Sequence, residues 1–198
     1  MVKTEFLHHF SKRFAPFHGP PTWLGVDLPN RISRDEADGL ETPFMSDEIK
    51  RAVWDCGDDR APGPDGFSFA FIKYFWYLIE PKITRLVAEF FHSSHFPKGC
   101  ISSFIALIPK ISDPKHVSDF RPISLIGCQY KIIGKFLANR LSGVIDGCVS
   151  REQSAFIKGH NILDGPMILN EVMRWHRKMK RKLMVFKVDF EKAFDSLR

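Results

Sequence analysis

The sequence predicts an α+β fold, because helix-type and strand-type patterns both occur in it and occupy separate stretches. Apolar residues recur at helical spacing in 83–91 and again in 132–144, which is typical of helices with one buried face. Three short segments, 101–109, 120–126 and 183–190, have the apolar content and the length of strands. Hydrophobic residues make up 44% of the 198 residues, which is enough to build a packed core.

Composition also limits the environment of the protein. The sequence has no run of 18 uncharged apolar residues, so no membrane span is expected. Its first residues lack the long apolar stretch of a signal peptide. The four cysteines are widely scattered without a C-x-x-C pair, which indicates neither a zinc site nor a disulfide framework. A reducing, intracellular compartment is the simpler expectation.

The first third of the chain is expected to hold an irregular linker, a short helix and a rigid loop. Five prolines between 15 and 46 argue against regular structure there. Ser46 or Asp47 is the expected N-cap of the helix that follows. The apolar face of this helix is expected to consist of Ile49, Val53 and Trp54. Residues 61–66 read Ala-Pro-Gly-Pro-Asp-Gly, which predicts a sharply turned loop.

The middle of the chain is predicted to combine two helices with a pair of strands. A helix over 69–78 is expected to end before Pro81, which suits the first turn of the next helix. A buried strand over 101–109 follows, and Asp113-Pro114 turns the chain towards a partner strand over 120–126.

The last third is predicted to contain two helices and one strand. The apolar stripe in 132–144 marks the first helix, and a second one is expected over 168–176. A turn over 178–182 then leads into a strand over 183–190 that ends in a cluster of carboxylates. Another face of the first helix is expected to carry Lys131, Lys135 and Asn139.

Charge is distributed unevenly along the chain. Residues 1–97 carry 11 Lys and Arg against 14 Asp and Glu, whereas residues 98–198 carry 18 against 9. A basic half indicates a polyanionic partner, and nucleic acid is the first candidate. A solvated basic surface would give the same count, so charge alone leaves both interpretations open.

The sharpest chemical pattern is Asp189 at the end of an apolar segment, followed by Glu191 and Asp195. A carboxylate at the end of a strand can be held rigidly at a sheet edge. Phosphoryl transfer uses such carboxylates to bind Mg²⁺ ions. Strand-end aspartates are also common turn and cap residues, so the pattern by itself fits a structural role as well.

Six blocks of this sequence follow one another in a characteristic order. The first is Arg60-Ala61-Pro62-Gly63-Pro64-Asp65-Gly66, and the last is the segment around Asp189, 185–195. Between them lie the blocks 105–110, 119–125, 130–141 and 153–160. These blocks, in this order, resemble reverse transcriptases of the LINE (non-LTR retrotransposon) type. Residues 4–59 also resemble the stretch that precedes this domain in plant-type elements.

The resemblance implies a fold and a function. The fold is the fingers and the first palm strand of a right-hand polymerase, with 1–59 as a pre-domain linker and N-terminal extension and 60–198 as a partial reverse transcriptase domain. The function is RNA-directed DNA synthesis with Mg²⁺, using an RNA template, a DNA primer and deoxynucleoside triphosphates. Nucleus and cytoplasm are not distinguished by these features.

The resemblance also assigns roles near the C-terminus. Asp189 resembles the first metal-binding, catalytic aspartate of the palm, and in such enzymes the backbone carbonyl of the next residue, here Phe190, also reaches a metal. Phe194 resembles the steric gate that favours deoxynucleotides, although a core aromatic would fit the same position. Asp195 is expected to be a helix cap or an ion-pair partner.

Cations further up the chain receive roles in the same way. Lys110 and Arg121 resemble the fingers cations that grip the triphosphate of the incoming nucleotide. The loop over 61–66 either positions the fingers near the template or is a structural turn, and the structural turn is favoured. Two interpretations fit the basic residues Lys131, Lys135 and Arg140: they contact template phosphates, or they lie on a solvated helix face.

Three features depart from the family pattern. Arg60 stands where Lys is usual, which preserves the charge. Lys158-Gly159-His160 stands where Pro-Gly-Arg is commoner. The sequence holds no aromatic-x-Asp-Asp segment, which supplies further carboxylates in the family, so the chain is expected to be a fragment that is inactive alone. The alternatives are a non-catalytic nucleic-acid-binding remnant and a metal-dependent nuclease that uses Asp189 and Asp195.

Overall fold

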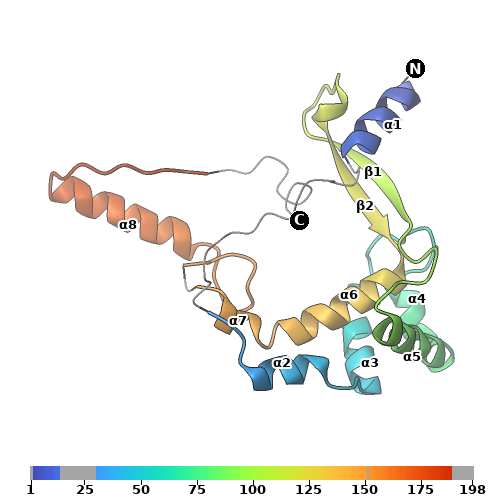
Figure 1. Cartoon of the computed structure of the whole chain (residues 1–198). Helices are drawn as coiled ribbons and strands as arrows, with labels where there is room; N and C mark the ends of the chain where they lie inside the picture. The colour runs from blue at the N-terminus through green and yellow to red at the C-terminus, as the bar shows by residue number, and fades with distance from the viewer. Residues whose placement is uncertain (1, 14–29, 151, 189–198) are drawn as a thin grey trace. The chain divides into compact units, whose positions relative to one another are not determined.

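The structure is a computed structural model, and it describes residues 2–13, 30–150 and 152–188. Within these residues the chain is mostly helical and contains a two-stranded antiparallel sheet (Figure 1). Helices and strands both occur, as an α+β fold requires. The elements are α1 (Val2–Arg13), α2 (Arg34–Glu41), α3 (Ser46–Trp54), α4 (Phe69–Tyr74), α5 (Trp76–Ser93), β1 (Ser103–Pro109), the 3-10 helix η1 (Val117–Asp119), β2 (Phe120–Ile126), α6 (Cys128–Leu141), α7 (Ile145–Cys148) and α8 (Asp164–Lys178).

The described residues form two compact units. The core unit comprises 30–110 and 120–150, and therefore holds α2 to α7 with both strands but without η1. The other unit, the α1/α8 unit, comprises the described residues of 2–13, 111–119 and 152–188. Because each unit has its own internal packing, each is described by itself.

The hydrophobic core of the core unit lies among α3, α4, α5 and α6, which contact one another (Figure 1). Helix α3 buries Ile49, Ala52 and Val53 completely, at the i, i+3, i+4 spacing of one helix face. Burying one large apolar side chain contributes about 1.5–3 kcal/mol. The largest fully buried side chains of the unit are Phe69, Phe136, Ile49, Ile132, Ile133, Val53 and Val87.

The two strands pair as the sequence predicts, but they are not buried. Their antiparallel register joins Ser103 to Ile126 and Pro109 to Phe120, so β2 has the predicted bounds and β1 starts two residues late. The expectation of a buried first strand is wrong, because Phe104 is 59% exposed and Ile108 is 47% exposed. A strand is buried only where other layers cover both faces of its sheet, and the described residues leave these side chains in solvent.

Helices before the loop differ from expectation in two places. Residues 15–46 were expected to be irregular, but α2 forms between the prolines. Ser33 caps it, and Ser33 and Glu36 exchange the two bonds of a capping box. The N-cap of α3 is Met45, because the side chain of Glu48 accepts a hydrogen bond from the Met45 backbone at 3.0 Å. This bond satisfies the helix start without a Ser or Asp cap.

The expected break at Pro81 is also wrong, because Pro81 lies inside α5. The helices separate earlier, at Phe75, which caps the end of α4 and the start of α5. A proline inside a helix costs about 3 kcal/mol because it lacks a backbone N–H. Pro81 has no N–H to donate to the carbonyl of Tyr77, but Pro81 is exposed, so water can bind that carbonyl instead. Beyond Pro81, helix α5 still buries Ile83 and Val87.

The C-terminal helix is confirmed, but the strand after it is not. Helix α8 covers the predicted 168–176, and the left-handed Lys180 turns the chain after it. Residues 183–188 have no regular secondary structure, and the described β1–β2 sheet has no third strand. A strand requires a neighbour to satisfy its backbone hydrogen bonds, and this segment has none among the described residues.

Candidate functional site

The proline- and glycine-rich loop over 61–67 packs against the junction of β2 and α6. The carboxylate of Asp65 accepts a hydrogen bond from the backbone N–H of Cys128, the first residue of α6, at 2.5 Å. The N-cap of this helix is Gly127, which has no side chain to accept that bond. Asp65 therefore caps α6 from 63 residues away, and its negative charge is favourable at a helix N-terminus.

Gly63 allows this close approach. A Cβ atom at this position would lie 2.3 Å from the Ile126 carbonyl carbon and 2.5 Å from the Gly127 nitrogen. The loop is turned by a hydrogen bond from Gly66 N–H to the Gly63 carbonyl at 3.0 Å, with Gly66 at a positive φ of 72°. These contacts support the structural interpretation of the loop and explain why glycines stand at these positions.

The cysteine at the start of α6 is a packing residue. Cys128 is 3% exposed, and its thiol donates to the carbonyl of Phe67 at 3.0 Å. Burial raises the pKa of the Cys128 thiol to about 11, and the charge of Asp65 adds to the shift. The thiol is therefore protonated at neutral pH and is not a nucleophile.

The two predicted triphosphate cations lie at the same end of the β1–β2 hairpin. Lys110 follows β1 directly, and Arg121 pairs with Ile108 in the register. Both side chains are exposed. Among the described residues the Arg121 guanidinium has no hydrogen-bond or ion-pair partner, so its N–H groups can donate to an anion.

The basic face of α6 contacts the protein itself. Lys131 donates to the carbonyl of Ala61 in the loop at 3.1 Å. Lys135 lies 4.0 Å from the carboxylate of Asp55, which also accepts a bond from Asn139 at 2.8 Å. An ammonium group has three N–H donors, so each lysine keeps donors beyond the one that contacts the described part of the protein.

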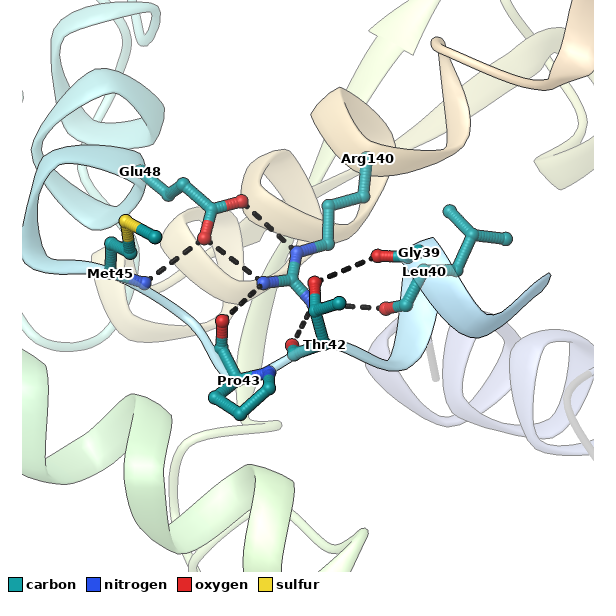
Figure 2. A network of polar contacts seen from close by, with 7 residues as sticks. All are labelled: Gly39, Leu40, Thr42, Pro43, Met45, Glu48 and Arg140. Atoms are coloured by element: carbon teal, nitrogen blue, oxygen red, sulfur yellow. Dashed lines mark hydrogen bonds and ion pairs between the residues drawn. The ribbon is translucent and has the colours of Figure 1, made fainter. Parts of the chain in front are cut away.

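Arg140, near the end of α6, is held from several sides (Figure 2). Its guanidinium bonds both carboxylate oxygens of Glu48, at 3.1 and 3.0 Å. It also donates to the carbonyls of Leu40 (2.9 Å), Thr42 (2.7 Å) and Pro43 (3.4 Å) in the turn after α2. These five bonds engage a group that has five N–H donors, and the side chain is only 9% exposed.

Glu48 joins three parts of the core unit. Its carboxylate accepts two hydrogen bonds from the Arg140 guanidinium and one from the Met45 backbone N–H. Helix α6, helix α3 and the turn before α3 therefore meet at one carboxylate (Figure 2). The hydrogen bond from Arg140 lowers the pKa of Glu48, and burial opposes this shift. The guanidinium also lies 4.8 Å from the ring centre of Phe136, which adds a cation–π attraction. The sequence alone does not indicate that Glu48 and Arg140 form a pair, because 92 residues separate them.

An apolar cavity of about 540 Å³ lies beside the loop in the core unit. Asp65 and Phe67 form one part of its lining, and Lys82 and Gln129 are among its polar residues. The volume falls in the range of small-molecule sites. Most of its apolar lining comes from Phe71, Ile72, Phe75, Leu78, Ile79, Ile83, Leu86 and Ile132.

The predicted catalytic and metal-binding residues Asp189 and Phe190, the predicted gate Phe194, and Asp195 lie outside the described residues. Across 2–13, 30–150 and 152–188, no group of three or more His, Cys, Asp and Glu side chains is arranged to hold a metal ion. Over the same residues, no helix is both long and apolar enough to cross a membrane.

Comparison with known proteins identifies the family. Residues 108–198 match the family described as reverse transcriptase (RNA-dependent DNA polymerase). The chain is 30% identical over 173 residues, 87% of its length, to the transposon TX1 uncharacterized 149 kDa protein of Xenopus laevis. It is 27% identical over 82% of its length to the Pol polyprotein of the type-1 retrotransposable element R2 of Nasonia vitripennis. It is also 27% identical, over 71% of its length, to the RNA-directed DNA polymerase from the mobile element jockey of Drosophila melanogaster.

These relatives are much longer than the chain, which spans 13%, 15% and 16% of their lengths. The match to the family covers the end of β1, all of β2 and α6, and the segment that contains Asp189. The cations of the hairpin therefore lie within the matched region. The chain belongs to the reverse transcriptases of non-LTR (LINE-type) retrotransposons and covers part of that domain.

Proposed function

We propose that this chain forms the nucleotide-binding fingers of an RNA-directed DNA polymerase. The observation that carries the proposal is the position of Lys110 and Arg121 at one end of the β1–β2 hairpin, both exposed. Arg121 would bind the triphosphate through two parallel hydrogen bonds and Lys110 as a point charge. In this proposal 60–198 is the partial polymerase domain, and 1–59 is an extension of the plant type.

The proposed catalytic step needs oxygen ligands for a metal ion from residues 189 and 190. The Asp189 carboxylate and the Phe190 carbonyl are hard oxygen donors of the kind that Mg²⁺ prefers. When bound, the metal would neutralise charge that develops on the phosphates. Phe194 would crowd the sugar 2′ position and select deoxynucleotides.

Template contacts are proposed for the lysines of α6. Among the described residues, Lys131 and Lys135 each contact one protein group, and both retain donors for a template phosphate. For Arg140 we propose a structural role, because its donors are directed to Glu48 and to three backbone carbonyls. An RNA template and a DNA primer are the expected partners.

Triphosphate binding tests the role of the hairpin. Isothermal titration calorimetry of the chain with deoxythymidine triphosphate and Mg²⁺ should show binding that Arg121→Ala weakens roughly ten- to hundredfold, since hydrogen bonds to charged groups contribute about 1.5–3 kcal/mol. Arg85→Ala is the matched control, because Arg85 is exposed on α5. Equal affinities for wild type and Arg121→Ala would contradict the proposal.

We further propose that these 198 residues do not extend a primer by themselves. Two Mg²⁺ ions require more than one carboxylate, and Asp189 supplies a single one. The test is primer extension on an RNA template with Mg²⁺ and all four deoxynucleotides. Product that disappears in Asp189→Ala would contradict this, whereas Mg²⁺-dependent cleavage lost in both Asp189→Ala and Asp195→Ala would indicate a nuclease.

The second candidate function is a non-catalytic nucleic-acid-binding remnant of a retroelement. It is favoured by the charge of residues 98–198, which carry 18 Lys and Arg against 9 Asp and Glu. Salt-sensitive binding of RNA without any triphosphate binding would support it over the first proposal.

A further inference from the structure

We propose that Asp65 is a positioning residue that fixes the direction in which the β1–β2 hairpin leaves the helical core. The proposal rests on the proposed function only for the role of the hairpin cations, since the geometry of the loop stands without it. Asp65 touches neither Lys110 nor Arg121. It would act through the junction between β2 and α6.

The junction is short and is a natural hinge. Strand β2 ends at Ile126 and α6 begins at Cys128, so Gly127 alone connects them (Figure 1). Arg121 lies five residues before the end of β2, which corresponds to roughly 17 Å at the rise of an extended strand. A rotation of about 10° at the junction would therefore displace the Arg121 backbone by roughly 3 Å. Displacements of about 1 Å already disturb reacting groups.

The loop over 61–67 contacts this hinge on both sides of Gly127. Gly63 lies against the backbone of Ile126, the last residue of β2, with no room for a Cβ atom. Asp65 binds the backbone of Cys128, the first residue of α6, at 2.5 Å. The same side chain also accepts from the Phe67 N–H at 3.4 Å, which holds its carboxylate in place. One loop thus holds the end of the strand and the start of the helix together.

A side chain at Gly127 and the Asp65 carboxylate exclude each other. A Cβ atom on Gly127 would lie 2.8 Å from the Asp65 carboxylate oxygen, so a Ser, Thr or Asn at the N-cap would displace it. The segment that leads into β1 is tied to the same helix turn, because the thiol of Cys100, three residues before β1, lies 2.6 Å from the Gln129 side-chain oxygen. The end of β2 and the segment before β1 are therefore both held at the first turn of α6, and Asp65 supplies the charged contact.

Hydrogen exchange measured by mass spectrometry on the 198-residue chain tests this role. In Asp65→Ala the amides of β1, β2 and the first turn of α6 should exchange about 3- to 30-fold faster, the factor expected for loss of an N-cap acceptor. Amides of α3 and α5 should change by less than about twofold. Asp65→Asn keeps an acceptor and should restore most of the protection. Asp59→Ala is the matched control, since Asp59 is exposed and lies six residues before Asp65.

Triphosphate affinity provides the second measurement. Asp65→Ala should weaken deoxythymidine triphosphate binding by about tenfold, and Asp65→Asn should recover it, although neither side chain touches the ligand. Faster exchange spread evenly over the whole core unit, or unchanged exchange in β1 and β2, would overturn the positioning role. If Asp65→Ala speeds exchange only in β1, β2 and the first turn of α6, but wild type binds no triphosphate, the proposed function is overturned and the positioning role is supported.

Discussion

Replacing Arg140 by methionine is expected to destabilise the core unit. Methionine keeps much of the side-chain volume and the helix propensity but removes the guanidinium. The change leaves the Glu48 carboxylate and the carbonyls of Leu40, Thr42 and Pro43 without their donors. These polar contacts join α6 to α3 and to the turn after α2.

The magnitude follows from burial and from the number of contacts. Breaking a buried ion pair by removing one partner costs about 3–5 kcal/mol. Arg140 is 9% exposed, but Glu48 is 34% exposed and can be partly rehydrated, so the lower end of that range applies. We expect a loss of about 3 kcal/mol in the free energy of unfolding for Arg140→Met. Arg140→Lys keeps the charge but cannot form the two-pronged bond to Glu48, so an intermediate loss is expected.

Urea unfolding followed by near-ultraviolet circular dichroism measures this loss. Trp54 and Trp76 report on the core unit, because their rings meet edge to face with centroids 5.3 Å apart. A double-mutant cycle with Glu48→Gln isolates the pair from the carbonyl contacts. An unfolding free energy of Arg140→Met equal to that of wild type, or a coupling energy below about 0.5 kcal/mol, would refute the reasoning.

The remaining predictions concern pH, packing and charge. The pKa of Glu48 is lowered in the folded state from its usual value of 4.5, so its stabilisation is present above that value and is lost as the pH falls through the folded pKa. Urea unfolding of Glu48→Gln should therefore depend less steeply on pH below about 5 than unfolding of wild type. Gly63→Ala should destabilise by about 1–3 kcal/mol in thermal unfolding, because its Cβ would lie 2.3 Å from the Ile126 backbone, whereas Gly134→Ala has open space and should not destabilise. Binding of duplex DNA through 98–198 should weaken with salt by a slope of roughly −0.9 in log K against log salt per phosphate contact, and binding that is independent of salt would contradict this.

Local patterns predicted the elements that depend on neighbouring residues. The bounds of β2, the pairing of β1 with it, and the helices α3, α6 and α8 all follow from apolar spacing and turn residues. The hairpin places Lys110 and Arg121 at one end because both adjoin the connection between its two antiparallel strands. The sequence also carried the signal for α2, in Ser33 and Glu36 at capping-box spacing, but the surrounding prolines outweighed it.

Contacts between distant segments could not be predicted in this way. Asp65 and Cys128 are 63 residues apart, and Glu48 and Arg140 are 92 apart. Nothing in the residues near Arg140 indicates that its guanidinium binds carbonyls of the turn after α2 and not a template phosphate. Spacing along a chain determines which side chains share a face of one element, because backbone geometry repeats with a fixed period. Which two elements meet depends on how the apolar faces pack, and only the tertiary structure decides that.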